Sequence, residues 1–227
     1  MKQTPPAPTR DLTLIELDLF CESARDAISG LNGYRKILED LLISAEDSDF
    51  SALKTRLTAA PESMHARILE ADYPYWWQQL FIPQFRASFF VWAVSVIEYH
   101  LAWAEKLANA LSTAPRTDRA TRDRSIAKGF QAFFSQLSDF GQAPDNMWLR
   151  LADAYKLRNA LGHAAATMHL QPDERRRALQ NAIKTFGALT DELFVELAPE
   201  HCEAVESLAG TVCHYLIAGL NRSARRS

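Results

Sequence analysis

The sequence predicts an all-α protein, folded as an up-down bundle of about six to eight helices. Apolar residues recur at helical spacing through most of the 227 residues, and no stretch alternates β-branched and polar residues between turn signals as a strand would. No repeat of fixed period is present, which disfavours a solenoid. With 48% hydrophobic and 23% charged residues, the chain has the composition of an ordinary globular protein.

The first half of the chain predicts helices of unequal strength. Apolar residues at helical spacing predict helix over 13–45, in which Gly30 and Gly33 indicate a break, so that this region forms either two helices or one kinked helix. A weaker helix is expected over 50–58. A helix over 84–111 is apolar around much of its circumference, which is typical of the central helix of a bundle.

The second half predicts four further helices separated by polar segments. A charged, proline-bearing loop is expected over 109–124, and Asp145 or Asn146 is the expected N-cap of the helix that begins at Met147. The predicted helices are, in order, 126–140, 147–166, 173–197 and 199–220.

These elements predict one helical domain over 11–220, between a disordered tail at 1–10 and a basic, disordered tail at 221–227. The first ten residues lack the apolar core of a targeting segment. The longest apolar run, 89–97, is far shorter than the roughly 20 residues of a membrane span, so no membrane segment is expected.

Cysteine usage and missing motifs narrow the possible chemistry. Three widely separated cysteines predict reduced thiols and a cytoplasmic location. The phosphate-loop, dinucleotide, nucleophile-elbow and zinc-protease motifs are all absent. Glu98 and His100 lie about 200° apart on a helix and cannot share a metal, and His163 and His169 lack further ligands. We therefore expect no cofactor and no metal, and we expect His100 to lie inside the bundle.

Positive charge gathers in one part of the chain. Residues 114–186 hold twelve basic and seven acidic residues, a net charge of +5, whereas the remainder has thirteen basic and twenty-one acidic residues, a net charge of −8. The positive excess surrounds the stretch YKLRNALGHAA at 155–165. It favours a polyanionic ligand there, although unevenly scattered surface charge gives the same count.

Within that stretch, polar residues interrupt the apolar stripe of a predicted helix. Asn159 and His163 are four residues apart and share one face, and Arg158 flanks them. Gly162 costs about 1 kcal/mol relative to alanine inside a helix, which suggests a close approach or a helix end there. We select Arg158, Asn159 and His163 as candidate catalytic residues. Three further residues are supporting candidates: Glu98, Tyr155 and Lys156.

The segment Arg158-Asn159-Ala160-Leu161-Gly162-His163 resembles the Arg-polar-x-x-x-His motif of the HEPN superfamily. The setting is also similar, since a long apolar helix with an embedded acid, Glu98, precedes the motif. The resemblance covers about 84–197 and leaves the helices over 11–70 as an addition to the HEPN-like core.

The resemblance implies a metal-independent endoribonuclease of a toxin or phage-defence system, which makes a 2′,3′-cyclic phosphate. It assigns proton transfer to His163, phosphate binding to Arg158 and orientation to Asn159, with RNA as substrate. It also implies a homodimer with a composite active site and a possible antitoxin or defence partner. Some relatives carry a modified tyrosine where this chain has Ala165, so a nucleotidyltransferase partner is not expected.

Two other interpretations remain open at this point. The chain could be a HEPN-like module that binds RNA or protein without cleaving, or an unrelated bundle in which Arg158 and His163 are solvated surface residues. Glu98 is expected to act chiefly as an interhelical ion-pair or capping residue.

Overall fold

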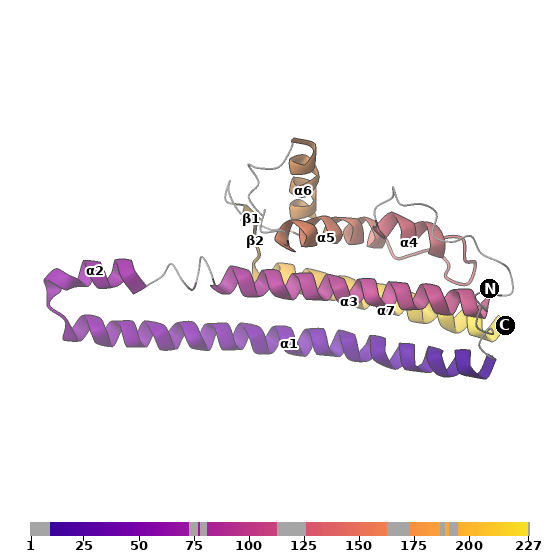
Figure 1. The fold of residues 1–227 in the computed structure, drawn as a ribbon, viewed down its shortest axis with the longest axis horizontal. Helices are drawn as coiled ribbons and strands as arrows, with labels where there is room; N and C mark the ends of the chain where they lie inside the picture. Colours follow the sequence, from indigo (N-terminus) through magenta and orange to yellow (C-terminus); the bar gives the residue numbers. More distant parts are fainter. Residues whose placement is uncertain are drawn as a thin grey trace, which may run out of the picture.

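A computed structural model of the chain describes residues 10–72, 77, 81–112, 126–162, 173–186, 189–190 and 195–226. These residues form seven helices and one short antiparallel strand pair (Figure 1). The elements are α1 (Arg10–Ala59), α2 (Glu62–Asp72), α3 (Ile82–Leu111), α4 (Ile126–Phe134), α5 (Met147–Gly162), α6 (Asp173–Phe186), β1 (Leu189–Thr190), β2 (Val195–Glu196) and α7 (Pro199–Arg226). The predicted all-α bundle is confirmed.

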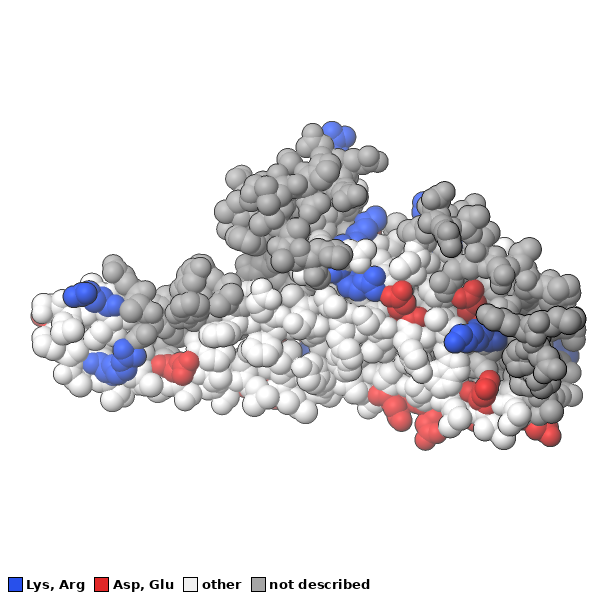
Figure 2. Space-filling model, in the orientation of Figure 1, with Lys and Arg blue, Asp and Glu red and all other residues white. Residues whose placement is uncertain are grey.

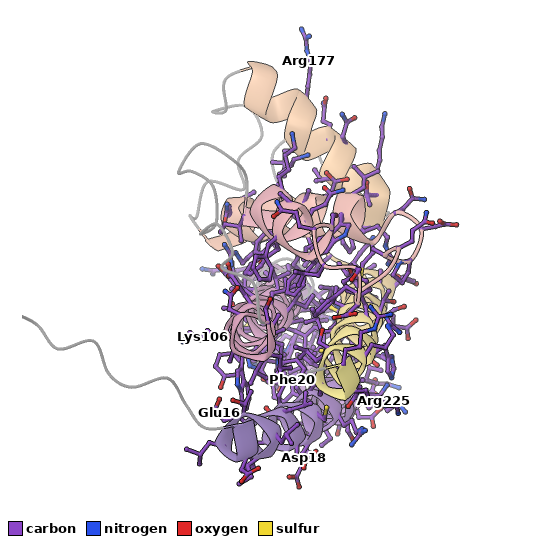
Figure 3. The ribbon with its side chains drawn as sticks, turned by 90° about the vertical axis from the view of Figure 1, so that its right-hand side faces the viewer. Glu16, Asp18, Phe20, Lys106, Arg177 and Arg225 are labelled. Atoms are coloured by element: carbon purple, nitrogen blue, oxygen red, sulfur yellow. The ribbon has the colours of Figure 1, made fainter. Side chains whose placement is uncertain are left out.

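Three long helices, α1, α3 and α7, form a bundle (Figures 1 and 3). As the residue numbers increase along α1, those of the contacting residues on α3 decrease. Ser23 lies beside His100, Tyr34 beside Trp92, and Glu39 beside Arg86. Helix α1 is therefore antiparallel to α3. The contacts of α1 with α7 show that these two helices are antiparallel as well, so α3 and α7 point in the same direction.

The core of this three-helix bundle is aromatic and aliphatic. Phe20 of α1 is fully buried, and Figure 3 shows it between the three helices. Its ring meets His100 edge-on at 5.9 Å. His100 is itself buried and bonds to Val96 O and Ser23 Oγ, which confirms the expectation that this histidine lies inside the bundle.

Partly buried ion pairs fix the register of the long helices. Arg35 of α1 reaches Glu206 and Glu203 of α7 at 2.7 and 3.0 Å, and Arg86 of α3 pairs with Glu39 of α1 at 2.9 Å. Each arginine is a rigid fork that accepts a carboxylate in only a few geometries. A slip of one helix along another would break these pairs, so they specify one alignment.

Helices α4, α5 and α6 form an upper layer on the side of α3 and α7 that faces away from α1 (Figure 1). The C-terminal end of α7 is tied to the turn before α5, because Arg222 donates to the carbonyls of Asp139 and Phe140. Gly219 of α7 meets the Phe140 ring so closely that an added Cβ would lie 2.3 Å from it. These contacts join the upper layer to the bundle.

The predicted break at Gly30 and Gly33 is wrong, since α1 runs through both glycines and through the separate helix expected over 50–58. Neighbouring residues explain the continuity. Leu31 is fully buried, and Asn32 donates to Glu206 of α7 at 2.6 Å. Packing along the bundle outweighs the roughly 1 kcal/mol that each glycine costs a helix.

Three other predicted boundaries need correction. Helix α4 ends at Phe134, because i→i+3 turn bonds follow it. Helix α6 ends at Phe186, not near Leu197, and the β1–β2 pair follows with Thr190 opposite Val195, two β-branched residues. The disordered tail predicted for 221–227 is wrong as far as Arg226, because α7 continues to that residue. Ser223 and Arg226 stabilise this end of α7 by donating to the Asp139 carboxylate.

Other predictions on this part of the chain are partly tested. A disordered tail was predicted for 1–10, but helix α1 begins at Arg10, so the prediction is wrong at that residue. Residues 1–9 lie outside the described part of the chain, as does most of the loop predicted for 109–124. Asn146 precedes α5 with φ 58°, a left-handed conformation that asparagine tolerates, and its carbonyl accepts from Arg150 N. It therefore occupies the N-cap position.

Helix α3 is also the single described helix that is long and apolar enough to cross a membrane. In this structure 44% of its most apolar 18-residue window is buried, against α1 and α7 above all. The same composition suits the core helix of a bundle.

Candidate functional site

Arg158 is the centre of the candidate site. It lies on α5, and 18% of its side chain is exposed. Nε and Nη2 donate to Asn159 Oδ1 at 3.2 and 3.1 Å, and the guanidinium carbon lies 4.9 Å from the centre of the Tyr155 ring. An amide and an aromatic face thus hold the guanidinium in a fixed plane.

Glu98 brings α3 into the site. Its Oε2 accepts from Arg158 Nη1 at 2.6 Å, and 36% of the Glu98 side chain is exposed. The expected interhelical ion pair of Glu98 is confirmed, and it ties α5 to α3. The distance between the two residues in the sequence is 60 positions, so only the packing of α5 on α3 could bring the acid to the arginine.

The arginine keeps part of its binding capacity. A guanidinium has five N–H donors, and the contacts to Glu98 and Asn159 use one hydrogen on each of its three nitrogens. Within the described part of the chain, the second N–H of Nη1 and the second N–H of Nη2 contact no acceptor. Guanidinium N–H groups of this kind can donate to the oxygens of a phosphate.

Lys156, a supporting candidate, does not join this group. Its Nζ donates to Asp153 Oδ1 at 2.7 Å, and two residues along a helix place it about 200° around α5 from Arg158. Tyr155, by contrast, is buried at 5% exposure and contacts Arg158 by its ring. The structure therefore brings together Glu98, Tyr155, Arg158 and Asn159.

His163 lies outside the described residues. Helix α5 ends at Gly162, and the predicted last four residues of this helix fall in the same undescribed part of the chain, together with His169. Asn159 is exposed, whereas Leu157 is fully buried. The apolar pattern of this helix also includes Leu149, which is nonetheless 60% exposed.

Asp153 is a residue of the upper layer that the sequence reasoning missed. It is 4% exposed, and its two oxygens bind Lys156 Nζ and Thr185 Oγ1 of α6, both at 2.7 Å. The sequence contained a sign of this role, because Asp153 lies among the apolar residues of the helix and precedes a lysine by three residues. Its position against α6 makes it a structural residue that holds α6 on α5.

The cysteines offer no nucleophile at neutral pH. Burial raises the pKa of Cys202 and of Cys213 to about 12, and it also raises the pKa of Cys21. All three thiols are buried and free. Among the residues that the structure describes, no three His, Cys, Asp or Glu side chains gather as they would around a metal ion.

Comparisons with protein families, with curated proteins and with solved structures find no match for this chain.

Proposed function

We propose that the chain is a metal-independent endoribonuclease of the HEPN type, in which Arg158 and His163 act on one phosphodiester. The observation that carries the proposal is the anchored guanidinium of Arg158, which is 18% exposed and lies five residues before a histidine. Two of its N–H groups contact no acceptor among the described residues. The net positive charge of 114–186 favours a polyanion in this part of the molecule.

The proposed chemistry uses few groups. The ribose 2′-oxygen attacks the phosphorus, the bond from phosphorus to the 5′-oxygen breaks, and the products are a 2′,3′-cyclic phosphate and a 5′-hydroxyl. Histidine has an ordinary pKa of about 6.5, so His163 can take the proton from the 2′-hydroxyl or give one to the 5′-oxygen. Arg158 binds the non-bridging oxygens, whose negative charge grows in the transition state.

Glu98 and Asn159 act on Arg158 in this proposal. By accepting from the guanidinium, they hold its remaining donors in one orientation before RNA binds. Preorganised donors need no rearrangement during the reaction, which is the main source of electrostatic catalysis. Tyr155 supports the guanidinium from below with its ring. Glu98 is thus a positioning residue in this proposal.

The assembly belongs to the same proposal. Two copies that pair near α5 would place two Arg158–His163 sets around one RNA, one histidine serving as base and the other as acid. The resemblance also suggests a cytoplasmic toxin or defence protein, with an antitoxin or defence partner.

A second function uses the same surface without cleavage. A HEPN-like module would bind RNA or a protein through Arg158 and the arginines of α6, of which Arg177 is exposed and projects away from the body (Figure 3). The observation that favours this alternative is the exposed Arg177, because a solvated positive charge attracts a phosphate without any general acid or base.

Cleavage of structured RNA in EDTA tests the proposal. The wild-type protein should produce fragments that end in a 2′,3′-cyclic phosphate. His163→Ala should lower the rate about 10²-fold or more, the usual contribution of a general acid or base. Arg158→Ala should lower it to a similar extent.

Matched controls lie on α7. His214→Ala and Arg225→Ala change exposed residues of the same types, and the cleavage rate should stay within about twofold of wild type. Undiminished cleavage by His163→Ala would remove this histidine from the mechanism. RNA binding by the wild type without any cut product would favour the binding module.

A further inference from the structure

An apolar surface lies on the side of the bundle where α1 and α3 adjoin, and the proposed ribonuclease does not use it. We call it the aromatic face. Its side chains are each between 43 and 61% exposed, and they are Tyr34, Ile37 and Leu41 of α1 with Phe85, Trp92 and Tyr99 of α3.

The two halves of the aromatic face are continuous. The Tyr34 ring meets the Trp92 ring edge-on with 5.2 Å between centroids. Because α1 and α3 are antiparallel, seven residues up α1 from Tyr34 correspond to seven residues down α3 from Trp92. Leu41 therefore lies level with Phe85, and the face extends along both helices.

The centre of the aromatic face carries no charge. Figure 2 shows a white surface over the middle of α1 and α3, with blue and red side chains towards both ends. The nearby charges on α3 point elsewhere: Arg86 pairs with Glu39, and Glu98 pairs with Arg158 of the upper layer. A binding partner for this surface needs no complementary charge.

The aromatic face has the size of the apolar centre of an interface. An aromatic side chain has roughly 150–250 Å² to bury, so its four aromatic residues, about half exposed, present on the order of 400 Å². Ile37 and Leu41 extend this patch. Apolar patches of a few hundred Å² usually mark interaction sites, and a stable pair of proteins buries about 800 Å² on each partner.

The spacing on α3 indicates what occupies this surface. Phe85, Trp92 and Tyr99 recur every seven residues, and Ser88 and Ser95 lie between them on the same side of α3. A seven-residue repeat with two positions facing outwards is the pattern by which one helix packs along another. Large side chains that alternate with small ones interdigitate with a facing helix that carries the same alternation.

We propose that the aromatic face pairs with the aromatic face of a second copy of this chain, with the two α3 helices antiparallel about a two-fold axis. In the antiparallel alignment centred between positions 92 and 95, each aromatic residue faces a small one. Trp92 lies against the partner subunit's Ser95, Tyr99 against the partner subunit's Ser88, and Phe85 against the partner subunit's Ala102. Because the contact is two-fold symmetric, each of these three residue pairs occurs twice in it.

This contact is separate from the pairing near α5 that belongs to the proposed function. Glu98 and Tyr99 are consecutive on α3 and point about 100° apart, the first to α5 and the second to solvent. A chain that uses only the aromatic face forms a dimer. A chain that uses both contacts forms a larger assembly, and the inference holds whether or not the protein cleaves RNA.

The mass of the full chain in solution tests the inference, by light scattering or sedimentation equilibrium at about 100 µM, far above the Kd of a specific interface. The wild type should have at least twice the mass of one chain. Trp92→Glu should lower the mass twofold, because a buried, unpaired charge opposes the contact. A wild-type mass of one chain would overturn the inference.

A second variant distinguishes loss of the contact from misfolding of Trp92→Glu. Ser95 is exposed and its hydroxyl donates to Val91 O of its own helix, so Ser95→Arg adds a charge without removing a packed ring. It should also lower the mass twofold with an unchanged helical circular dichroism spectrum. Ile43→Glu on α1 is the control, since Ile43 is 57% exposed but lies about 200° around α1 from Leu41, away from the aromatic face, and the mass should stay unchanged.

The competing occupant is a lipid surface, because α3 has the length and composition of a membrane span. Vesicles of phosphatidylcholine distinguish the two. We expect the protein to stay in the supernatant when the vesicles are sedimented. Sedimentation of a single-chain protein with the vesicles, lost in Trp92→Glu, would overturn self-pairing, as would a mass that neither Trp92→Glu nor Ser95→Arg lowers.

Discussion

The three-helix bundle and the upper layer use polar contacts in different ways. In the bundle, Arg35 and Arg86 bind carboxylates of neighbouring long helices and fix their register. In the upper layer, Arg158 binds Glu98 of α3, and two of its N–H groups contact no acceptor among the described residues. The guanidinium groups are about equally exposed, at 17% for Arg86 and 18% for Arg158, but Glu98 is 36% exposed whereas Glu39 is 15% exposed. The difference teaches that similar arginine–carboxylate pairs fix alignment where both partners are enclosed, whereas at the edge between two layers the carboxylate stays accessible to solvent.

The largest expected effect comes from breaking the bundle. Phe20→Ala removes a fully buried ring from among the three long helices and should lower the free energy of unfolding by about 3–5 kcal/mol. Urea denaturation followed by circular dichroism measures this loss. Leu19→Ala, one residue away and 52% exposed, should change stability by less than about 0.5 kcal/mol. Equal losses would contradict the burial described for α1.

The junction between the two regions should respond next. Gly219→Ala places a methyl group 2.3 Å from the buried Phe140 ring, and overpacking of this kind costs about 1–3 kcal/mol. Gly210→Ala on the same helix meets nothing within 4 Å and should be neutral or gain up to about 1 kcal/mol from helix propensity. Thermal unfolding of the two variants measures the difference in sign, and stabilisation of both would show that α7 does not touch the Phe140 turn.

The smallest effect is expected within the upper layer. Thr185→Val removes the hydroxyl that donates to Asp153 and should cost about 1 kcal/mol. Hydrogen exchange should show that the loss is concentrated in α6. Thr211→Val on α7 removes a hydroxyl that donates to the carbonyl four residues earlier in its own helix. The single hydroxyl hydrogen of Thr185 lies between such a carbonyl and Asp153, so a larger loss for Thr185→Val measures the Asp153 contact. No difference would mean that Asp153 does not hold α6.

Much of the helical architecture follows from periodicity. Helix α3 was predicted within two residues at its start and at its end, because apolar residues surround most of it. Gly30 and Gly33 misled the prediction for α1, since glycine lowers local helix propensity but cannot report the packing of Leu31 and Arg35 against α7. The end of α6 was misplaced for a related reason. The short β1–β2 pair depends on two segments meeting, which periodicity within one segment does not reveal.

The candidate site was predictable only in part. The six-residue pattern from Arg158 selected Arg158 and Asn159, and the structure places them in contact. Lys156 was selected by proximity in sequence, and the rotation of a helix carries it to Asp153 instead. His163 stays a prediction, because it lies outside the described residues. The aromatic face was not anticipated, since exposed and buried aromatic residues have the same helical spacing.

By itself, the sequence determined that the chain is helical, which helix is most apolar, and which residues form the polar group on α5. Helix periodicity and residue chemistry act locally, so a single chain segment contains them. Only the tertiary structure decided that Glu98 meets Arg158, that Asp153 holds α6, and that Phe85, Trp92 and Tyr99 remain exposed. Those outcomes depend on which helices pack together and in which register, and contacts between distant segments set both.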